Sequence, residues 1–259
     1  MKAACKIFAL ALLLLPAAAI AADKPKADIS VSTALLKDPD ATVVELFTSQ
    51  GCSSCPPAQA FLQDLSHRPD VITLEWHVDY WDQLKTWTGG SWKDPFSDNN
   101  WTQRQVAYNK LLGTTSRAYT PEMIIDGKFQ EVGSNRANVT ALIKEAAAVR
   151  RQKFKVVPGV TPDGHVKTVI SGPGLSKDMQ VILLRLQKEA ETEVKGGENK
   201  GVTMKGHNIV KGLLVIGTYG GGTSDYTFDM PHYKPNESCA VLLQDPETLH
   251  ILAGGMCAL

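Results

Sequence analysis

The segment TVVELFTSQGCSSCPP, residues 42–57, gives the strongest indication of fold in this chain. Its opening run, residues 42–47, is rich in apolar and β-branched side chains, which predicts a buried strand. A turn-prone stretch follows, and over residues 56–65 the apolar side chains take the spacing of a helix. Cys52 and Cys55 therefore lie where a buried strand gives way to a helix.

The position of Cys52-Ser53-Ser54-Cys55 at the start of a helix favours thiol chemistry. A thiolate there faces backbone N–H groups that lack intrahelical partners, and it faces the positive end of the helix dipole. Both stabilise the charged form, so Cys52 is expected to be the more acidic and more nucleophilic thiol. It would attack a substrate disulfide, and Cys55 would then resolve the mixed disulfide. A structural disulfide and a metal clip are the alternatives that the spacing leaves open.

Strand-like and helix-like segments alternate up to residue 153, which predicts an α/β layer structure. A capping residue, Ser134, is expected to begin the last helix of this half. After the first strand and helix, the expected elements are a strand at 71–78, a helix at 101–112, a hairpin at 122–132 that turns at Asp126-Gly127, and a helix containing Val139 to Val149.

From Phe154 onward the pattern changes to short extended runs separated by glycine, proline and aspartate. No strong helical period is present, so this half is predicted to be a small antiparallel β-sandwich. The expected strands are residues 154–160, 166–171, 180–187, 208–219, 226–230 and 240–244.

Residues 1–22 have the pattern of a secretory signal peptide. Lys2 and Lys6 give a positive start, residues 7–15 form an apolar run, and the small residues at 17–22 offer a cleavage site. The apolar run is too short to span a bilayer comfortably, and no later segment has the roughly 18 uninterrupted apolar residues that a span needs. We therefore expect a periplasmic or secreted protein with no membrane span in the mature chain.

Removal of this leader takes Cys5 with it and leaves Cys52, Cys55, Cys239 and Cys257. Four cysteines in an exported protein favour disulfides, because an oxidising compartment lets such bonds persist. A four-cysteine zinc site is the alternative, but zinc ligands usually come as two close pairs and only one close pair exists here. No metal site is therefore expected.

The two C-terminal cysteines flank a predicted hairpin. Opposed residues of an antiparallel hairpin have a constant sum of positions, and Cys239 and Cys257 sum to 496, which centres the pairing on Thr248. The turn-prone residues 245–248 lie around that centre. The two sulfurs would be cross-strand neighbours, close enough to bond if the site is a non-hydrogen-bonded pair. The sequence therefore predicts a structural disulfide that clamps this hairpin.

The overall composition is that of a folded, soluble protein. Apolar residues make up 43% of the 259 and charged residues 21%, which is too apolar for a disordered chain. Lysine plus arginine total 27, and aspartate plus glutamate also total 27. This balance gives no electrostatic basis for binding nucleic acid or an acidic membrane surface.

The dipeptide Thr120-Pro121 stands directly before the strand expected at residues 122–125. A cis bond here would turn the chain sharply and present the backbone of Thr120 toward the cysteine pair. The sequence does not fix the isomer, and a trans proline at an edge strand is the alternative.

Together these features resemble the thioredoxin superfamily. More closely, the chain is similar to an exported bacterial thioredoxin-like family that is catalogued as a domain of unknown function. The resemblance implies a thioredoxin-like fold, a redox-active pair at Cys52 and Cys55, and an active-site proline at Pro121; residues 85–91 are extra length relative to the family pattern. The matching motifs are VELFTSQGCSSCPP at 44–57, HVDYWD at 77–82, WKDPFS at 92–97, RQVAY at 104–108, YTPEMIIDG at 119–127 and GENKG at 197–201.

Four further residues are candidates for proton transfer or for lining a substrate groove. Glu45 lies in an apolar strand ahead of Cys52, and a buried acid behind a dithiol can accept a proton. His77 and Asp79 lie where the second strand ends, at the edge of an α/β sheet that usually binds ligands. Thr120 is a candidate through its backbone. The sequence assigns no chemical role to the GENKG loop, residues 197–201.

The expected protein thus has a thioredoxin-like domain at residues 23–153 and a β-sandwich domain at 154–259. Its predicted function is thiol–disulfide exchange in the cell envelope with a protein or small-molecule thiol or disulfide, without a cofactor. Two alternatives stay open: a module that binds copper(I) through the two thiolates, and a non-catalytic scaffold with an inert disulfide. Substrate, direction of electron flow and oligomeric state stay open as well.

Overall fold

The computed structural model describes residues 37–85, 90–113, 118–150, 153–161, 163–229 and 234–257. The expected leader, residues 1–22, lies outside the described residues. All described residues belong to one compact unit, Val31–Leu259. Among the helices described, none is long and apolar enough to cross a membrane.

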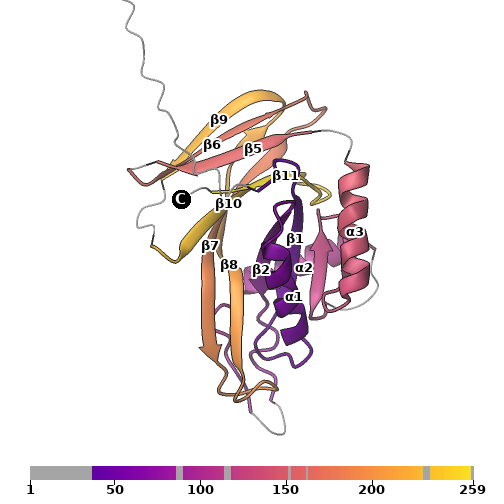
Figure 1. The fold of residues 1–259 in the computed structure, drawn as a ribbon, viewed down its shortest axis with the longest axis vertical. Coiled ribbons are helices and arrows are strands. Elements are labelled where there is room, and N and C mark those ends of the chain that lie inside the picture. Colours follow the sequence, from indigo (N-terminus) through magenta and orange to yellow (C-terminus); the bar gives the residue numbers. More distant parts are fainter. Residues whose placement is uncertain are drawn as a thin grey trace, which may run out of the picture. The chain divides into compact units, whose positions relative to one another are not determined.

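The first half of the chain folds in the predicted order of strand, helix, strand, helix, hairpin and helix (Figure 1). The elements are β1 (Thr42–Thr48), α1 (Pro56–Ser66), β2 (Val71–His77), α2 (Asn99–Leu111), β3 (Glu122–Ile125), β4 (Phe129–Val132) and α3 (Arg136–Val149). Strand β1 pairs in parallel with β2 on one side and antiparallel with β3 on the other, and β4 extends the sheet beyond β3.

The two faces of this sheet carry different helices because successive side chains of a strand point to opposite faces. Val44 and Leu46 of β1 pack with buried residues of α1 and α3, among them Leu62 and Ile143. On the other face Phe47 packs with Tyr108 of α2 at a ring-centroid distance of 6.2 Å. The segment between β1 and α1, which holds the cysteine pair, is therefore fixed by two well-packed elements.

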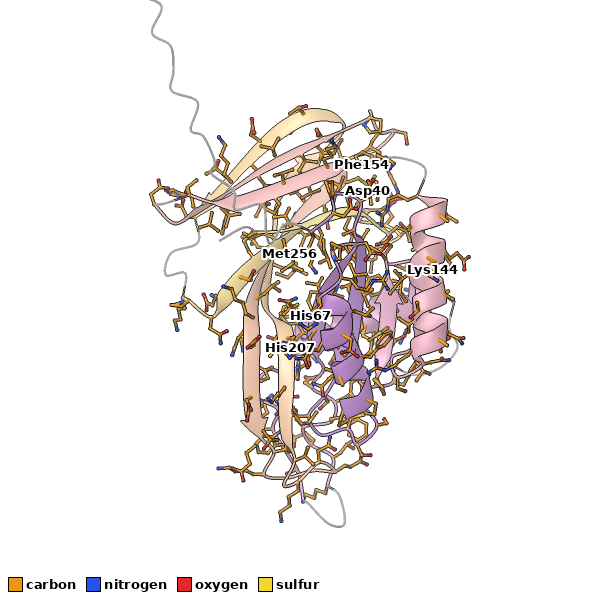
Figure 2. The ribbon with its side chains drawn as sticks, viewed as in Figure 1. Asp40, His67, Lys144, Phe154, His207 and Met256 are labelled. Atoms are coloured by element: carbon orange, nitrogen blue, oxygen red, sulfur yellow. A yellow bond between two sulfur atoms is a disulfide. The ribbon has the colours of Figure 1, made fainter. Side chains whose placement is uncertain are left out.

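The second half is built of strands alone. They are β5 (Lys155–Val160), β6 (His165–Gly172), β7 (Met179–Glu193), β8 (Thr203–Tyr219), β9 (Gly222–Asp229), β10 (Glu237–Gln244) and β11 (Ile251–Met256). Strands β5, β6 and β9 form a small antiparallel sheet. An apolar cluster joins it to β7, β10 and β11. It contains Phe154, which precedes β5 and is labelled in Figure 2, and Val156 of β5, together with Val181 and Leu243 of the larger sheet.

The larger sheet crosses the boundary that the sequence places at residue 153. Its strand order is β11-β10-β7-β8-β2-β1-β3-β4, so four strands of the second half continue the sheet of the first. The junction is one parallel pairing between β2 and β8, Glu75 with Ile209. The backbone N–H of His207, labelled in Figure 2, also donates to the Glu75 carboxylate at 2.8 Å. The described chain is thus a mixed α/β structure with one large sheet and one small sheet.

Several elements differ from the sequence prediction at their ends. Helix α3 is capped by Asn135 rather than Ser134, because the Asn135 side chain accepts from the Asn138 N–H. Helix α2 begins at Asn99, two residues before the expected start, because Asp98 accepts from the Asn100 N–H at 2.8 Å. Strands β7 and β8 have 15 and 17 residues and extend well beyond the runs that the sequence predicts.

Strand β11 has weak strand character in sequence because two of its six residues are Gly254 and Gly255. The structure gives the physical reason for both. A Cβ at Gly254 would lie 3.1 Å from side-chain atoms of Leu242 and Val43, and one at Gly255 would collide with the carbonyl oxygen of Val156. The close approach of β11 to its neighbours thus requires glycine at position 255 and leaves little room for a side chain at position 254.

The C-terminal hairpin has the register that its cysteines indicate. Ala240 pairs with Met256 and Leu242 with Gly254, so paired positions sum to 496 up to an irregularity after Leu243. A disulfide joins Cys239 to Cys257, with Cα atoms 5.2 Å apart, and both residues are buried in the cluster between the two sheets. The expectation of a non-hydrogen-bonded pair is wrong, because the Cys257 N–H donates to the Cys239 carbonyl at 2.8 Å.

We expect the double substitution Cys239→Ala, Cys257→Ala to lower the free energy of unfolding by about 3 kcal/mol, because the bond closes a loop of 18 residues in the unfolded chain. Urea denaturation of the two proteins at the same pH measures the difference. Equal midpoints and slopes for variant and wild type would contradict a stabilising role for this bond.

Candidate functional site

The cysteine pair, Cys52 and Cys55, lies between β1 and α1 and forms a disulfide with Cα atoms 5.5 Å apart. Cys55 is the N-cap of α1, and its carbonyl accepts the first helical hydrogen bonds, from Ala58 and Gln59. Prolines occupy the first two helical positions, where an N–H would have no intrahelical partner. The pair is therefore at the positive end of a helix, as the sequence predicts.

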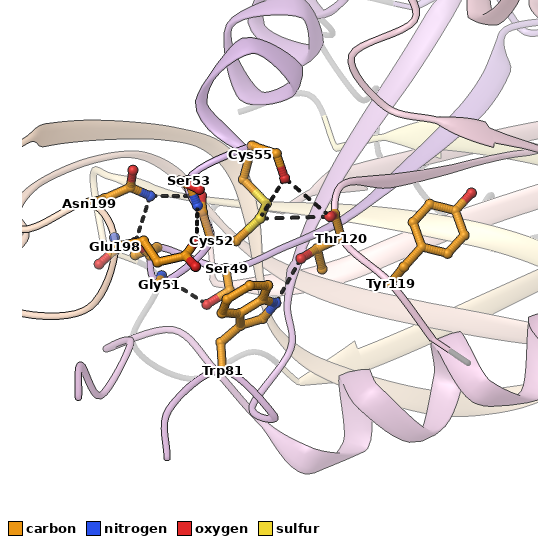
Figure 3. The surroundings of a disulfide bond; sticks show 12 residues. Ser49, Gly51, Cys52, Ser53, Cys55, Trp81, Tyr119, Thr120, Glu198 and Asn199 are labelled. Atoms are coloured by element: carbon orange, nitrogen blue, oxygen red, sulfur yellow. Dashed lines mark hydrogen bonds between the residues drawn. A yellow bond between two sulfur atoms is a disulfide. The ribbon is translucent and has the colours of Figure 1, made fainter. Parts of the chain in front are cut away.

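Thr120, in the segment directly before β3, lies against this pair (Figure 3). Its carbonyl oxygen is 3.7 Å from Cys52 Sγ and accepts from the Ser54 hydroxyl at 3.5 Å. The Trp81 indole N–H donates to its hydroxyl at 2.7 Å. The Thr120-Pro121 bond is cis. Of the four residues proposed for proton transfer or a groove, Thr120 is the one whose atoms contact the pair.

The hairpin tip, residues 194–202 between β7 and β8, also contacts the pair (Figure 3). Asn199 Nδ2 donates to the carbonyl oxygens of Gln50 at 3.0 Å and of Cys52 at 2.8 Å. Glu198 Oε2 accepts from the Ser53 N–H at 2.9 Å. Sequence reasoning missed this contact, although the GENKG motif containing both residues is among those that carry the family resemblance.

The two sulfur-bearing residues are buried while the dipeptide between them is not. Cys52 is 1% exposed and Cys55 is fully buried, whereas Ser53 and Ser54 are exposed. Both cysteines of the disulfide are therefore covered by neighbouring residues, although nucleophilic attack by Cys52 on a substrate needs access to its sulfur. The reason is tertiary packing: the hairpin tip and the segment at Thr120 close over a motif that local sequence would leave at the surface.

His77 belongs to a buried ionic cluster. Its Nδ1 lies 2.7 Å from Asp94 and its Nε2 lies 3.0 Å from Glu75, and all three side chains are almost fully buried. Burial alone lowers the pKa of His77, but the two carboxylates, Asp94 foremost, raise it to about 10. The same interaction lowers the pKa of Asp94 against the effect of burial. His77 is thus a cation with both nitrogens engaged, rather than a proton carrier facing the pair.

This cluster holds the backbone that leads into the cysteine pair. Asp94 Oδ2 accepts from the Gln50 N–H at 2.7 Å, and Glu75 Oε1 accepts from the Gln59 amide of α1 at 2.6 Å. His77 therefore influences the site indirectly, by holding Asp94 and Glu75 where they bind Gln50 and Gln59.

Glu45 and Asp79 are not brought to the cysteine pair. Glu45 points to the opposite face of the sheet, where it accepts from Arg104 Nε at 2.8 Å and from the Tyr108 hydroxyl of α2. Asp79 accepts from the Thr102 hydroxyl at 2.6 Å near the start of α2. Glu45 points this way because side chains alternate along a strand. Val44 and Leu46, on either side of it, face α1, so Glu45 must face away from α1.

Glu122 is a buried acid that sequence reasoning did not single out. It follows Pro121 directly and accepts from the side-chain amides of Gln105 and Gln130. Burial raises the pKa of Glu122 to about 7, although these amide donors oppose the rise. Its two partners belong to α2 and β4.

Within the part of the chain that the structure describes, no three or more His, Cys, Asp or Glu side chains form a group that could hold a metal ion.

We expect His77→Gln to lower the free energy of unfolding by roughly 3–5 kcal/mol near pH 7, because it leaves two buried carboxylates without their cation. The folded pKa of about 10 exceeds the ordinary 6.5, so the contribution is complete below pH 6.5 and is lost as the pH rises through 10. Urea denaturation at about pH 6, 8 and 10 should show the gap between variant and wild type narrowing. The exposed His67, changed to Gln, is the matched control, and a gap that stays constant with pH would contradict the ionic role.

Comparison with known proteins places the chain in a family. The family described as Protein of unknown function (DUF1223) matches residues 43–244, a range that contains the cysteine pair, Thr120-Pro121 and the hairpin tip. No curated protein matches the chain.

Among solved structures, the chain is similar to the crystal structure of protein AGR_C_4864 from Agrobacterium tumefaciens. The TM-score is 0.70 at 24% identity, over 86% of this chain and 96% of that one, which shows a shared fold across both halves. A domain of the outer membrane lipoprotein Omp28 from Porphyromonas gingivalis matches over 42% of this chain and 88% of that domain, at 13% identity. Its TM-score of 0.26 is too low to indicate a shared fold. The family match is the finding that classifies the protein: the chain belongs to the DUF1223 family.

Proposed function

We propose that this protein is a thiol–disulfide oxidoreductase of the cell envelope that acts through Cys52 and Cys55. The observation that carries the proposal is the position of their disulfide at the start of α1, with the Thr120 carbonyl 3.7 Å from Cys52 Sγ. A helix N-terminus stabilises a thiolate and so supplies both an attacking group and a good leaving group.

We further propose that residues 42–149 form a thioredoxin-type domain. The support is the order of strand, helix, strand, helix, hairpin and helix, with α1 and α3 packed on one face of the sheet and α2 on the other. The cysteine pair precedes the first helix and the cis Thr120-Pro121 bond precedes the hairpin. These are the positions that the resemblance to the thioredoxin superfamily implies for the dithiol and the active-site proline.

The exchange reaction follows from the chemistry of two neighbouring thiols. In the reducing direction, the Cys52 thiolate attacks one sulfur of a substrate disulfide, forms a mixed disulfide and releases the other substrate sulfur as a thiolate. The Cys55 thiolate then attacks Cys52 Sγ, which closes the Cys52–Cys55 bond and releases the second substrate thiolate. Two electrons pass from the protein to the substrate, and two protons balance the charge. The reverse sequence oxidises a substrate dithiol.

Two features of the chain support a role outside the cytoplasm. Residues 1–22 have the pattern of a secretory leader, and the mature chain carries the disulfide Cys239–Cys257 in addition to the reactive pair. Structural disulfides persist in oxidising compartments.

We expect Cys55→Ser to accumulate a mixed disulfide with substrate, because the resolving thiol is gone, and Cys52→Ser to slow exchange at least about 100-fold. The assay is reduction of a disulfide-bonded test protein by dithiothreitol, with trapped adducts detected by mass spectrometry. The matched control is Cys239→Ala, Cys257→Ala, which removes a disulfide elsewhere and should retain exchange below its unfolding temperature.

Exchange that survives Cys52→Ser unchanged would contradict the proposed mechanism. A parallel titration of the reduced protein with copper(I) separates the metal alternative: stoichiometric copper(I) binding by the two thiolates, without exchange activity, would replace the proposed function with metal handling.

A further inference from the structure

The hairpin tip is bound to the reactive motif by hydrogen bonds that join residues about 145 positions apart in the chain. Asn199, only 5% exposed, donates through one amide nitrogen to the carbonyls of Gln50 and Cys52. The fit is close, since a Cβ on Gly197 would lie 3.4 Å from Gly51 Cα. The left-handed backbone of Gly197, φ +70°, therefore lets the tip reach the loop.

Glu198 brings a negative charge to the same place. Its carboxylate accepts from the Ser53 N–H, the first backbone donor after Cys52, at 2.9 Å (Figure 3). Among the residues that the structure describes, Glu198 has no ion pair. Its charge is thus not neutralised by a neighbouring side chain.

The other charged groups packed around the motif are accounted for. Asp94 reaches the loop through the Gln50 N–H, but His77 neutralises it. Asp82, in the segment that carries Trp81, is paired with Lys93 at 2.7 Å. The first turn of α1 contains no acidic residue. Glu122 bonds to Gln105 and Gln130, and Asp79 bonds to Thr102, rather than to residues 50–55. Among the described acids, Glu198 is thus the one that hydrogen-bonds to the Cys52–Cys55 segment itself and has no paired cation.

A carboxylate in this position opposes the effect of the helix start. Because the first two residues of α1 are prolines and have no N–H, the backbone donors nearest to Cys52 belong to the loop, and among them the Ser53 N–H is already engaged by Glu198. The carboxylate also repels a negative charge forming on Cys52. Both effects disfavour the thiolate, and a less stable reduced pair favours the disulfide.

We propose that Glu198, held in place by Asn199, is a positioning residue that disfavours the Cys52 thiolate and so biases the pair toward its disulfide. This deepens the proposed function and rests on it for its biological meaning. The second half of the chain would then influence the reduction potential of the Cys52–Cys55 pair in the first half. A substrate that displaces the hairpin tip would meet a more reactive pair.

The test compares Glu198→Gln, which keeps the hydrogen-bond acceptor and removes the charge, with wild type. Two uncharged probes avoid charge effects on the reagent. Iodoacetamide alkylation of the reduced protein reports the Cys52 thiolate, and equilibration with dithiothreitol reports the stability of the disulfide. In that equilibrium one dithiothreitol gives two electrons and two protons to the Cys52–Cys55 bond and becomes the cyclic disulfide.

We expect Glu198→Gln to raise the alkylation rate of Cys52 near pH 7 about threefold to tenfold and to shift the dithiothreitol equilibrium toward the reduced pair by a similar factor. Both effects should shrink in about 1 M salt, because Glu198 is exposed and its charge is screened. Glu193→Gln is the matched control, being an exposed glutamate of β7 on the same hairpin, and it should change neither quantity.

Asn199→Ala should move both quantities in the same direction, because the released tip no longer holds Glu198 at the Ser53 N–H. The double variant Glu198→Gln, Asn199→Ala should add little beyond either single change. If Asn199→Ala fails to fold, the Glu198→Gln result decides alone.

An alkylation rate and an equilibrium within twofold of wild type for Glu198→Gln would overturn the inference, whatever its effect on melting temperature. Failure of the proposed function gives a different result: no catalysed exchange with protein disulfides in any variant, while Glu198→Gln still shifts the two thiol measurements.

Discussion

The buried imidazolium of His77, held between Glu75 and Asp94, is the interaction on which the arrangement of this molecule depends. Glu75 also binds the Gln59 amide of α1 and the His207 N–H of β8. Asp94 binds the Gln50 N–H ahead of the cysteine pair. A cation with two carboxylates inside a packed interior is stable only when every partner is in place, because each unpaired charge there would cost several kcal/mol.

The position of β8 links this cluster to the reactive motif. Strand β8 joins the first half of the sheet at one pairing, Glu75 with Ile209, beside the ionic cluster. From there β7 and β8 extend as a long hairpin, whose tip binds residues 50–53 through Asn199 and Glu198. The second half is therefore part of the candidate site, because it supplies two of the side chains that contact the cysteine pair.

Both cysteines of the pair are buried in this structure. If the pair exchanges with a protein substrate, as proposed, part of this cover would have to move aside. Ser53 and Ser54, which lie between the two cysteines, are exposed. The similarity to the Agrobacterium protein extends over 86% of this chain, so both halves belong to the shared fold. Because the hairpin tip of the second half covers the cysteine pair of the first, this arrangement needs both halves of the chain.

The sequence by itself determined the features that depend on residues close to one another in the chain. Apolar periodicity placed β1, α1 and β2 within a residue or two of their observed ends, Asp126-Gly127 supplied the two positive φ angles of the β3–β4 turn, and the cysteine positions indicated the register of the last hairpin. These features follow from backbone geometry over a few residues, or from pairing arithmetic across one turn.

Only the tertiary structure decided which distant side chains meet. The charge on His77, the turning of Glu45 away from the pair and the contact of Glu198 with Ser53 all depend on how separate elements pack. Glu198 and Ser53 are 145 positions apart, and no local pattern encodes a hydrogen bond over that separation. Burial of the cysteine pair has the same cause, since the residues that cover it come from two other segments of the chain.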